Sequence, residues 1–236
     1  MNNSILNICL NFAQSLLPQN CLLCTAEAGY AVLCRPCSAE LPLHSAPACP
    51  VCAYPTPAGE VCGACLAHPP AYSRTIAAYT YAYPLDKLVQ ALKYHHQFAV
   101  VDILTAPLLT HIRASAEPLP DTVIAMPLHR NRLRQRGFNQ SQQLAHAIAG
   151  QLKLPLLNHA CQRSRDTPPQ AALPLKERRG NIRNAFTCDN SVAGKRIAIV
   201  DDVMTSGSTL DSLARALLDA GASEIQCWVV ARAVLR

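Results

Sequence analysis

The second half of the chain alternates between short apolar runs and amphipathic segments. Three runs have the length and continuity of strands, at residues 122–128, 196–200 and 225–233. Between them lie two segments with apolar residues at helical spacing. One follows the capping residues Asn139 and Ser141, and the other covers 211–221. With a further strand expected around 181–187, this alternation predicts an α/β core over residues 121–236, a parallel sheet with helices on both faces.

Residues 71–120 show helical periodicity. Leu85, Leu88, Val89 and Leu92 fall on one stripe of a helix, with polar residues opposite. A second apolar stretch, 98–112, precedes a proline-containing linker. We therefore expect a helical hood or connector ahead of the core.

The first residues are also amphipathic, since Ile5, Cys9, Phe12 and Leu16 share one helical face. This pattern predicts a packing helix within residues 1–19. Attachment to a membrane or a protein partner is the alternative, although no basic residue accompanies the apolar face.

Composition places the chain among globular proteins, because half of its 236 residues are hydrophobic and 15% are charged. No apolar run is long enough to cross a bilayer, and the first Lys or Arg is Arg35, which leaves no secretory signature. We therefore expect a cytoplasmic protein without an integral membrane segment. In that compartment, twelve cysteines favour metal binding over disulfides.

Eight of the cysteines form a repeat. Each half reads C-x₂-C-x₉-C-x₂-C, and the second half follows the first by 28 residues. Two thiolates separated by two residues suit a tetrahedral ion, and two such pairs complete a closed, structural Cys₄ shell. The predicted ligands are Cys21, Cys24, Cys34, Cys37, Cys49, Cys52, Cys62 and Cys65.

The repeat predicts a double zinc ribbon over residues 20–70 that holds two zinc ions. Few large apolar residues lie between the cysteine pairs, so the metal would have to stabilise this segment. The short loops favour sequential pairing over an interleaved arrangement, and buried or disulfide-linked thiols are the alternative to metal. Cys9, Cys161, Cys188 and Cys227 lack this spacing and are expected to be small core residues.

The strand at 196–200 ends at two acids and a hydroxyl-rich loop. Asp201 and Asp202 come first, and Thr205, Ser206, Gly207, Ser208 and Thr209 follow. In a parallel sheet, this loop would wrap a phosphate with its backbone N–H groups and hydroxyls at a helix N-terminus. The carboxylates would accept hydrogen bonds from neighbouring ligand hydroxyls, which favours a ribose 5-phosphate. They would also lie where positive charge develops on a ribosyl ring that loses its leaving group.

The segment IAIVDDVMTSGST resembles the phosphoribosyl pyrophosphate (PRPP) motif of type I phosphoribosyltransferases. Together with MPLHRNRLRQRGFNQSQQLA, RDTPPQAALPLKERRGNIRNAF and the cysteine pairs, it makes nearly the whole chain similar to the ComF family. That resemblance implies a double zinc ribbon joined to a phosphoribosyltransferase domain, and a role in DNA uptake during natural transformation.

The resemblance also implies roles for particular residues. Asp201 and Asp202 would bind the ribose hydroxyls and carry any catalysis, and the PRPP motif continues through Val203 and Met204 to Thr205–Thr209. Pro127, Leu128 and His129 take the place of the pyrophosphate loop, and 163–183 that of a flexible loop. Mg²⁺ would accompany PRPP.

Residues 122–165 contain no Asp or Glu but several arginines. Those singled out to bind nucleic acid or pyrophosphate are Arg130, Arg132, Arg134, Arg136, Arg178 and Arg179. In HRNRLRQRG the arginines alternate, so on an extended loop they would share one side. Phe138 is the best candidate for stacking on a base, and a solvated basic loop without a ligand is the alternative.

Three functions follow. The first is a PRPP-binding protein of the ComF type that handles single-stranded DNA, with a DNA-uptake helicase or another competence protein as a possible partner. The second is an ordinary phosphoribosyltransferase with a small acceptor, and the third is a zinc-ribbon scaffold with a vestigial pocket. The paucity of aromatic residues, 5% of the chain, argues against base stacking in either of the first two.

Overall fold

The computed structural model describes residues 19–164 and 185–234. The predicted N-terminal helix, Arg178 and Arg179, and most of the predicted flexible loop lie outside these ranges.

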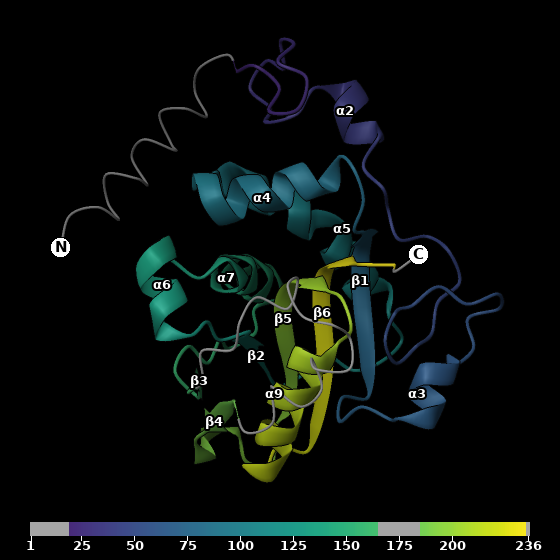
Figure 1. Ribbon diagram of the computed structural model, residues 1–236, viewed down its shortest axis with the longest axis vertical. Helices are drawn as coiled ribbons and strands as arrows, with labels where there is room; N and C mark the ends of the chain where they lie inside the picture. Colours follow the sequence, from purple (N-terminus) through teal and green to yellow (C-terminus); the bar gives the residue numbers. More distant parts are fainter. Residues whose placement is uncertain (1–18, 165–184, 235–236) are drawn as a thin grey trace.

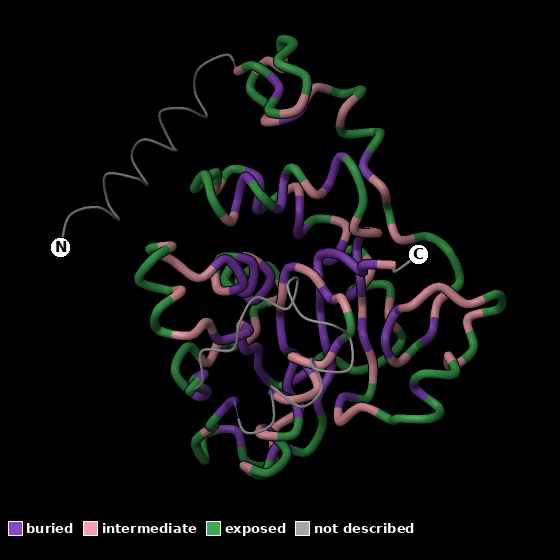
Figure 2. Tube along the Cα trace, in the orientation of Figure 1, coloured by how far each residue is buried: buried purple, intermediate pink, exposed green. Residues whose placement is uncertain are grey.

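A four-stranded parallel sheet forms the centre of the molecule, with strand order β1-β6-β5-β2 (Figure 1). Its strands are β1 (Arg74–Thr80), β2 (Thr122–Ala125), β5 (Arg196–Met204) and β6 (Glu224–Arg232). A separate antiparallel hairpin is formed by β3 (Cys161–Arg163) and β4 (Phe186–Cys188). β5 and β6 are buried along most of their length, as continuous apolar runs predict for central parallel strands (Figure 2).

Helices cover both faces of this sheet, which confirms the predicted fold class. On one face lie α4 (Leu85–His95), α5 (Val101–Ala114) and α7 (Gln140–Leu152), which share one core cluster with Val200 and Trp228. On the other face, α9 (Ser208–Asp219) packs against Ile197 and Ile199. Short helices α2 (Arg35–Ala39), α3 (Gly63–Ala67) and α6 (Arg130–Arg136) and two 3₁₀ turns, Phe98–Val100 and Asn190–Val192, complete the described elements.

The segment 71–120 is not wholly helical. Its first part forms β1, an edge strand that pairs with β6 along its length. RTIAAYT contains three β-branched residues and a tyrosine, which favour a strand, but it is short and its apolar and polar positions do not alternate strictly, so its periodicity gave no clear signal. This strand brings the ribbon that precedes it directly beside the sheet.

Other differences from the expected elements concern boundaries. β2 ends at Ala125, three residues before the expected end at 128. β5 continues through both acids to Met204, and α9 already begins at Ser208, so only Thr205–Gly207 form the turn between them. The predicted cap of α7 is confirmed, because the Asn139 side chain accepts a hydrogen bond from the backbone N–H of Ser141.

Candidate functional site

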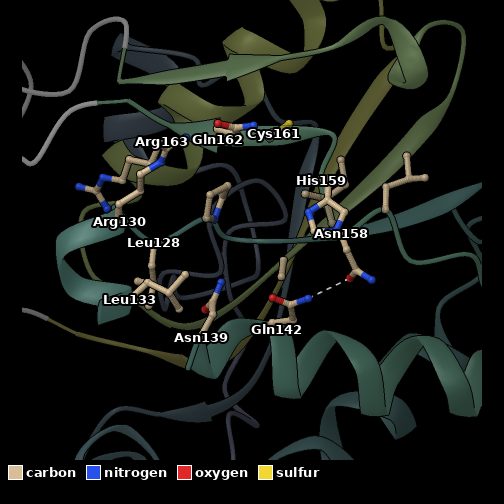
Figure 3. Close-up of a pocket in the computed structure, with 14 residues that line it drawn as sticks. Leu128, Arg130, Leu133, Asn139, Gln142, Asn158, His159, Cys161, Gln162 and Arg163 are labelled. Carbon is tan, nitrogen blue, oxygen red and sulfur yellow. Dashed lines mark hydrogen bonds between the residues drawn. The ribbon is translucent and has the colours of Figure 1, made fainter. Parts of the chain in front are cut away.

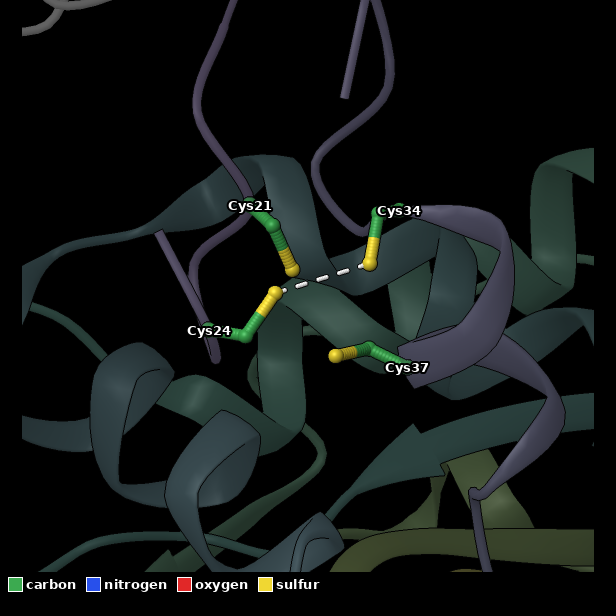
Figure 4. Close-up of side chains that lie close together, drawn as sticks. All are labelled: Cys21, Cys24, Cys34 and Cys37. Atoms are coloured by element: carbon green, nitrogen blue, oxygen red, sulfur yellow. Dashed lines mark hydrogen bonds between the residues drawn. The ribbon is translucent and has the colours of Figure 1, made fainter. Parts of the chain in front are cut away.

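The eight cysteines of the repeat form two clusters, each built from one half of the repeat. Within each cluster all four sulfur atoms lie within 4.8 Å of one another, and Figure 4 shows the thiols of Cys21, Cys24, Cys34 and Cys37 converging. The Cys24–Cys34 and Cys52–Cys62 sulfur pairs are each 3.6 Å apart. Thiolates at about 2.3 Å from a shared tetrahedral ion lie at about this spacing, so both clusters fit structural zinc.

The structure confirms sequential pairing and shows how far the repeat extends. The residue after the second cysteine, Thr25 or Ala53, has a positive φ in both ribbons, which turns the chain so that both sulfurs face one point. Helices α2 and α3 each begin directly after the third cysteine. The isolated bridges Asn20–Glu27 and Ala48–Pro55 are also 28 residues apart.

Without metal, each cluster retains protons. Backbone hydrogen bonds outweigh burial and lower the pKa of Cys21 to about 6 and that of Cys49 to about 7. The last cysteines move the other way: sulfur contacts with Cys24 and Cys34 raise the pKa of Cys37, and burial raises that of Cys65. A cation at the centre would displace the remaining protons and hold four thiolates together.

The two predicted acids are held from two different helices. Asp201 Oδ1 accepts hydrogen bonds from the Ser141 hydroxyl of α7 at 2.9 Å and from the backbone N–H of Asp202. Asp202 is buried, and its Oδ2 lies 2.5 Å from the ammonium nitrogen of Lys93, at the end of α4. The acid pair therefore lies where α4 and α7 meet the carboxyl end of β5.

These contacts control protonation at the acid pair. Burial, with the neighbouring charge of Asp202, raises the pKa of Asp201 to about 7. Burial disfavours the charged form of Lys93, but the Asp202 carboxylate outweighs it and raises the Lys93 pKa above its usual value. Lys93 thus stays cationic, while Asp201 changes charge near neutral pH.

The loop predicted to hold a phosphate turns directly into α9. Gly207, at φ 76°, precedes the helix, and its carbonyl accepts a hydrogen bond from the Asp211 N–H. The hydroxyl oxygens of Ser206 and Ser208 lie 2.8 Å apart. A Cβ added at Gly207 would lie 2.7 Å from both the Tyr72 hydroxyl and the Met204 methyl group, so packing as well as conformation requires glycine here.

A cavity of about 300 Å³ lies beside the predicted pyrophosphate loop. Leu128 lines it, and Asn139, Gln142, Asn158 and His159 contribute polar groups. Figure 3 shows Arg130 and Arg163 on the same side of this cavity. His129 does not line the cavity but caps α6, where its Nδ1 accepts the N–H of Asn131 at 3.3 Å.

The expectation that the alternating arginines share one side is wrong, because HRNRLRQRG is helical. Residues two apart on a helix point in different directions, whereas residues four apart share a face. Arg130 and Arg134 are exposed, while Arg132 and Arg136 are half-buried. Arg136 donates to Gln140 Oε1 and lies over the Tyr94 ring, 5.3 Å from its centroid. Two arginines of α6 are therefore presented to solvent, where four were expected.

Phe138, the residue expected to stack on a base, packs against other rings of the protein. Its ring packs against Phe98 and His96, with centroid distances of 5.0 and 5.1 Å. It joins α4, the following 3₁₀ turn and the start of α7.

Two of the cysteines expected to be separate core residues are paired. Cys161 and Cys188 face each other across the β3–β4 hairpin and form a disulfide, with a Cα–Cα distance of 4.2 Å. Their separation of 27 residues gave no signal, since only the hairpin brings them together. Cys227 is buried in the core as expected, and Cys9 lies outside the described residues.

Three functional candidates were missed. The sequence pattern predicts Ser141 as a helix cap and places Lys93 on the polar face of a helix. It assigns no role to Arg232. The sequence signal for Lys93 is the presence of a lysine at the last turn of a helix whose neighbours are buried. Arg232 stands at the end of an otherwise apolar run, where a charge must find partners.

None of the helices within residues 19–164 and 185–234 is long and apolar enough to cross a membrane.

Comparison with known proteins matches both parts of the chain. A double zinc ribbon domain matches residues 12–66, and a phosphoribosyl transferase domain matches residues 135–234. The DNA utilization protein YhgH of Escherichia coli O157:H7 is 34% identical over 92% of this chain and 98% of its own length. Competence protein F of Haemophilus influenzae is 35% identical over 73% of this chain and 78% of its own. Competence protein ComFC of Bacillus subtilis is 23% identical over 80% of this chain and 79% of its own.

The similarity thus spans both the cysteine clusters and the acid pair with its loop, in the order in which they occur here. The chain belongs to the ComF family, in which a double zinc ribbon precedes a phosphoribosyltransferase domain.

Proposed function

We propose that this protein binds PRPP as its Mg²⁺ complex at the carboxyl end of β5 and acts in the handling of single-stranded DNA during DNA uptake. The observation that carries the first part is the acid pair followed by the loop 205–207 at the N-terminus of α9, a helix of 12 residues. Donors for a phosphate and acceptors for ribose hydroxyls lie next to each other there.

Each group has a separate task in this proposal. The N–H groups and hydroxyls of 205–209 take the 5-phosphate, and Asp201 and Asp202 accept hydrogen bonds from the ribose. Leu128 and His129 border the place of the pyrophosphate, where Mg²⁺ shields the charge and Arg130 adds a cation. Lys93 offsets the charge of Asp202 when no ligand is present.

The same carboxylates would stabilise positive charge on a ribosyl ring that loses pyrophosphate, which is the catalytic role we assign to them. In that event Ser141 keeps Asp201 oriented through its 2.9 Å hydrogen bond. Lys93 would balance the second acid, so that the two carboxylates can stay close together.

The DNA part of the proposal rests on the relatives and on charge. Proteins named for DNA utilization and competence are similar over most of this chain. Arg130 and Arg134 are exposed on α6, and Arg163 lies beside Arg130 at the cavity (Figure 3). The two exposed cations would contact the phosphates of a single strand, whereas Arg163 is buried over the Phe186 ring; a helicase or another competence protein would deliver the strand.

Titration calorimetry with Mg²⁺ and PRPP tests the first part. The parent protein should bind, and Asp201→Ala with Asp202→Ala should abolish binding while thermal unfolding shows an intact fold. The absence of heat with the parent, or equal affinity in the double variant, would remove the assigned site.

A fluorescence anisotropy titration with a labelled oligonucleotide tests the second part. Binding should weaken with salt and depend little on sequence. If the oligonucleotide does not bind even at low salt while PRPP does, the protein is a small-molecule enzyme and not a DNA-handling protein.

A further inference from the structure

Arg232 is a buried cation whose partners come from distant parts of the chain. It ends β6 and is only 6% exposed. Its Nε donates to the backbone oxygen of Cys52 at 2.7 Å, and its Nη1 donates to the backbone oxygens of Met204 at 3.1 Å, of Thr205, and of Ala233 at 2.6 Å. The guanidinium also lies over the Tyr54 ring, 5.3 Å from its centroid. One side chain therefore connects the second ribbon with the start of the phosphate loop.

These contacts hold the backbone segments together. A buried charge is costly unless its donors find acceptors, and here four carbonyl oxygens accept from Nε and Nη1 of one guanidinium. Movement of the Cys52 carbonyl would leave the Arg232 Nε without its acceptor, and movement of the Thr205 carbonyl would remove one of the three acceptors around Nη1. The two segments are thus ordered together.

Because peptide groups are planar, the contacts of Arg232 also fix the direction of N–H groups at the anion site. In a planar trans peptide the carbonyl and the next residue's N–H point in opposite directions. Because the carbonyls of Met204 and Thr205 point to Arg232, the N–H groups of Thr205 and Ser206 point away from it. Those are the first two N–H groups of the phosphate loop.

Cys52 connects the same contact to metal. Its sulfur belongs to the second cluster, and its carbonyl accepts from Arg232. Ala53, at φ 54°, follows in the tight turn that directs both groups, and its N–H donates to the Cys49 carbonyl. Without metal, the turn would lose the sulfur contacts that fix it.

We infer that Arg232 is a positioning residue through which the second zinc cluster sets the geometry of the 5-phosphate loop, so that zinc in the second cluster, and not in the first, is required for tight binding of the phosphoribosyl group. This inference rests on the proposed function for its ligand. The coupling between ribbon and loop can be measured without any ligand.

The experiment compares two matched cysteine variants of the full chain. Cys62→Ser and Cys34→Ser remove the third ligand of the second and first clusters, and both residues are half-buried at the start of a short helix. Amide hydrogen exchange of residues 204–209 is measured by mass spectrometry, with zinc content determined for each protein. We expect exchange in this peptide to accelerate about tenfold or more in Cys62→Ser and to change less than about twofold in Cys34→Ser.

A second set of variants separates positioning from general loss of structure. Arg232→Met should weaken binding of ribose 5-phosphate about tenfold, while Mg²⁺ with inorganic pyrophosphate binds within about twofold of the parent. Arg232→Lys should recover part of the loss, because a cation remains at the carbonyls. Arg196→Met, at the other end of β5 and paired with Asp121, is the control that should leave both ligands unaffected.

The outcomes distinguish this inference from the proposed function. Equal exchange in the two cysteine variants, or a parallel loss of both ligands in Arg232→Met with no recovery in Arg232→Lys, would overturn the coupling. If the two cysteine variants differ in exchange as expected but the parent protein binds neither ligand, the coupling stands as a link between ribbon and loop, while the proposed function and the ligand half of the inference fail.

Discussion

Both ribbons pack buried side chains against the core, but the second is in addition hydrogen-bonded to the sheet. Cys21, Leu33 and Leu41 belong to the same buried cluster as the residues of α4. In the second ribbon, the carbonyls of Pro50, Val51 and Cys52 accept hydrogen bonds from Thr75 and Arg232. The two ribbons also lie at different places on the core. In Figure 1, α2 of the first ribbon lies beyond α4, whereas α3 of the second lies beside β1.

The comparison shows that two halves of an internal repeat with equivalent cysteine clusters and bridges make different contacts with the core. The hydrophobic contact of the first ribbon is non-directional and sets no backbone atom of the site. The hydrogen bonds of the second are directional, and those of Arg232 reach the loop 205–207. The first ribbon also packs against α4, the helix that carries Lys93, the partner of Asp202.

Loss of one zinc ligand should have the largest effect and should differ between the ribbons. Cys49→Ser and Cys21→Ser both replace a buried first ligand, 1% and 2% exposed. We expect Cys49→Ser to lower the melting temperature of the core by about 5 °C or more and Cys21→Ser by about 2 °C or less, since a few kcal/mol is lost only where the ribbon supports the sheet. Scanning calorimetry measures this, and equal shifts would show that the two ribbons support the core alike.

Ligand binding should depend on pH through Asp201. Because the pKa of Asp201 is raised to about 7, the free protein gains stability from this group at low pH and loses it as the pH rises through 7. A ligand that needs the carboxylate should therefore bind about tenfold more tightly at pH 8 than at pH 6, with proton release near neutrality. Calorimetry in buffers of different ionisation enthalpy measures the released proton.

Asp201→Asn is the control for this pH dependence. It should bind more weakly than the parent, and its affinity should no longer change between pH 6 and 8. If the affinity of the parent protein does not change between pH 6 and 8, Asp201 does not control ligand binding through its protonation.

Thr75→Val tests the hydrogen bonding between the second ribbon and β1 by removing a single hydroxyl. The Thr75 hydroxyl, in a buried residue, donates to the Val51 carbonyl at 2.7 Å, and valine keeps the shape while removing the donor. We expect a loss of about 1–2 kcal/mol in the free energy of unfolding. Thr110→Val, an exposed change within α5, is the control, and denaturant unfolding that finds no difference between the two variants would count against the link to β1.

The smallest expected effect separates the two pairs of arginines on α6. Arg130→Ala with Arg134→Ala removes the exposed pair, and Arg132→Ala with Arg136→Ala removes the half-buried pair. If the exposed pair contacts two phosphates of a single strand, its loss should flatten the slope of log affinity against log salt by about 1.4. The loss of the half-buried pair should change the slope less. Anisotropy titrations at several salt concentrations measure both slopes, and a larger change in the half-buried variant would contradict the prediction.

The sequence alone determined the features that depend on local spacing. Cysteines separated by two intervening residues can present both sulfurs to one ion, so the two Cys₄ clusters and their repeat of 28 residues could be predicted without a fold. An apolar run followed by acids, hydroxyls and glycine likewise fixes a strand, a turn and a helix in sequence order. The class of fold followed from the alternation of such elements.

Only the tertiary structure decided which distant groups meet. Lys93 and Asp202 are far apart in sequence, as are Cys161 and Cys188, and Cys52 and Arg232. No periodicity in a single segment reports such contacts, because they arise when helices and a hairpin pack against the sheet and buried charges must find partners. The helical conformation of HRNRLRQRG was also settled by its cap at His129 and its end at Gly137, and it divided an expected basic face in two.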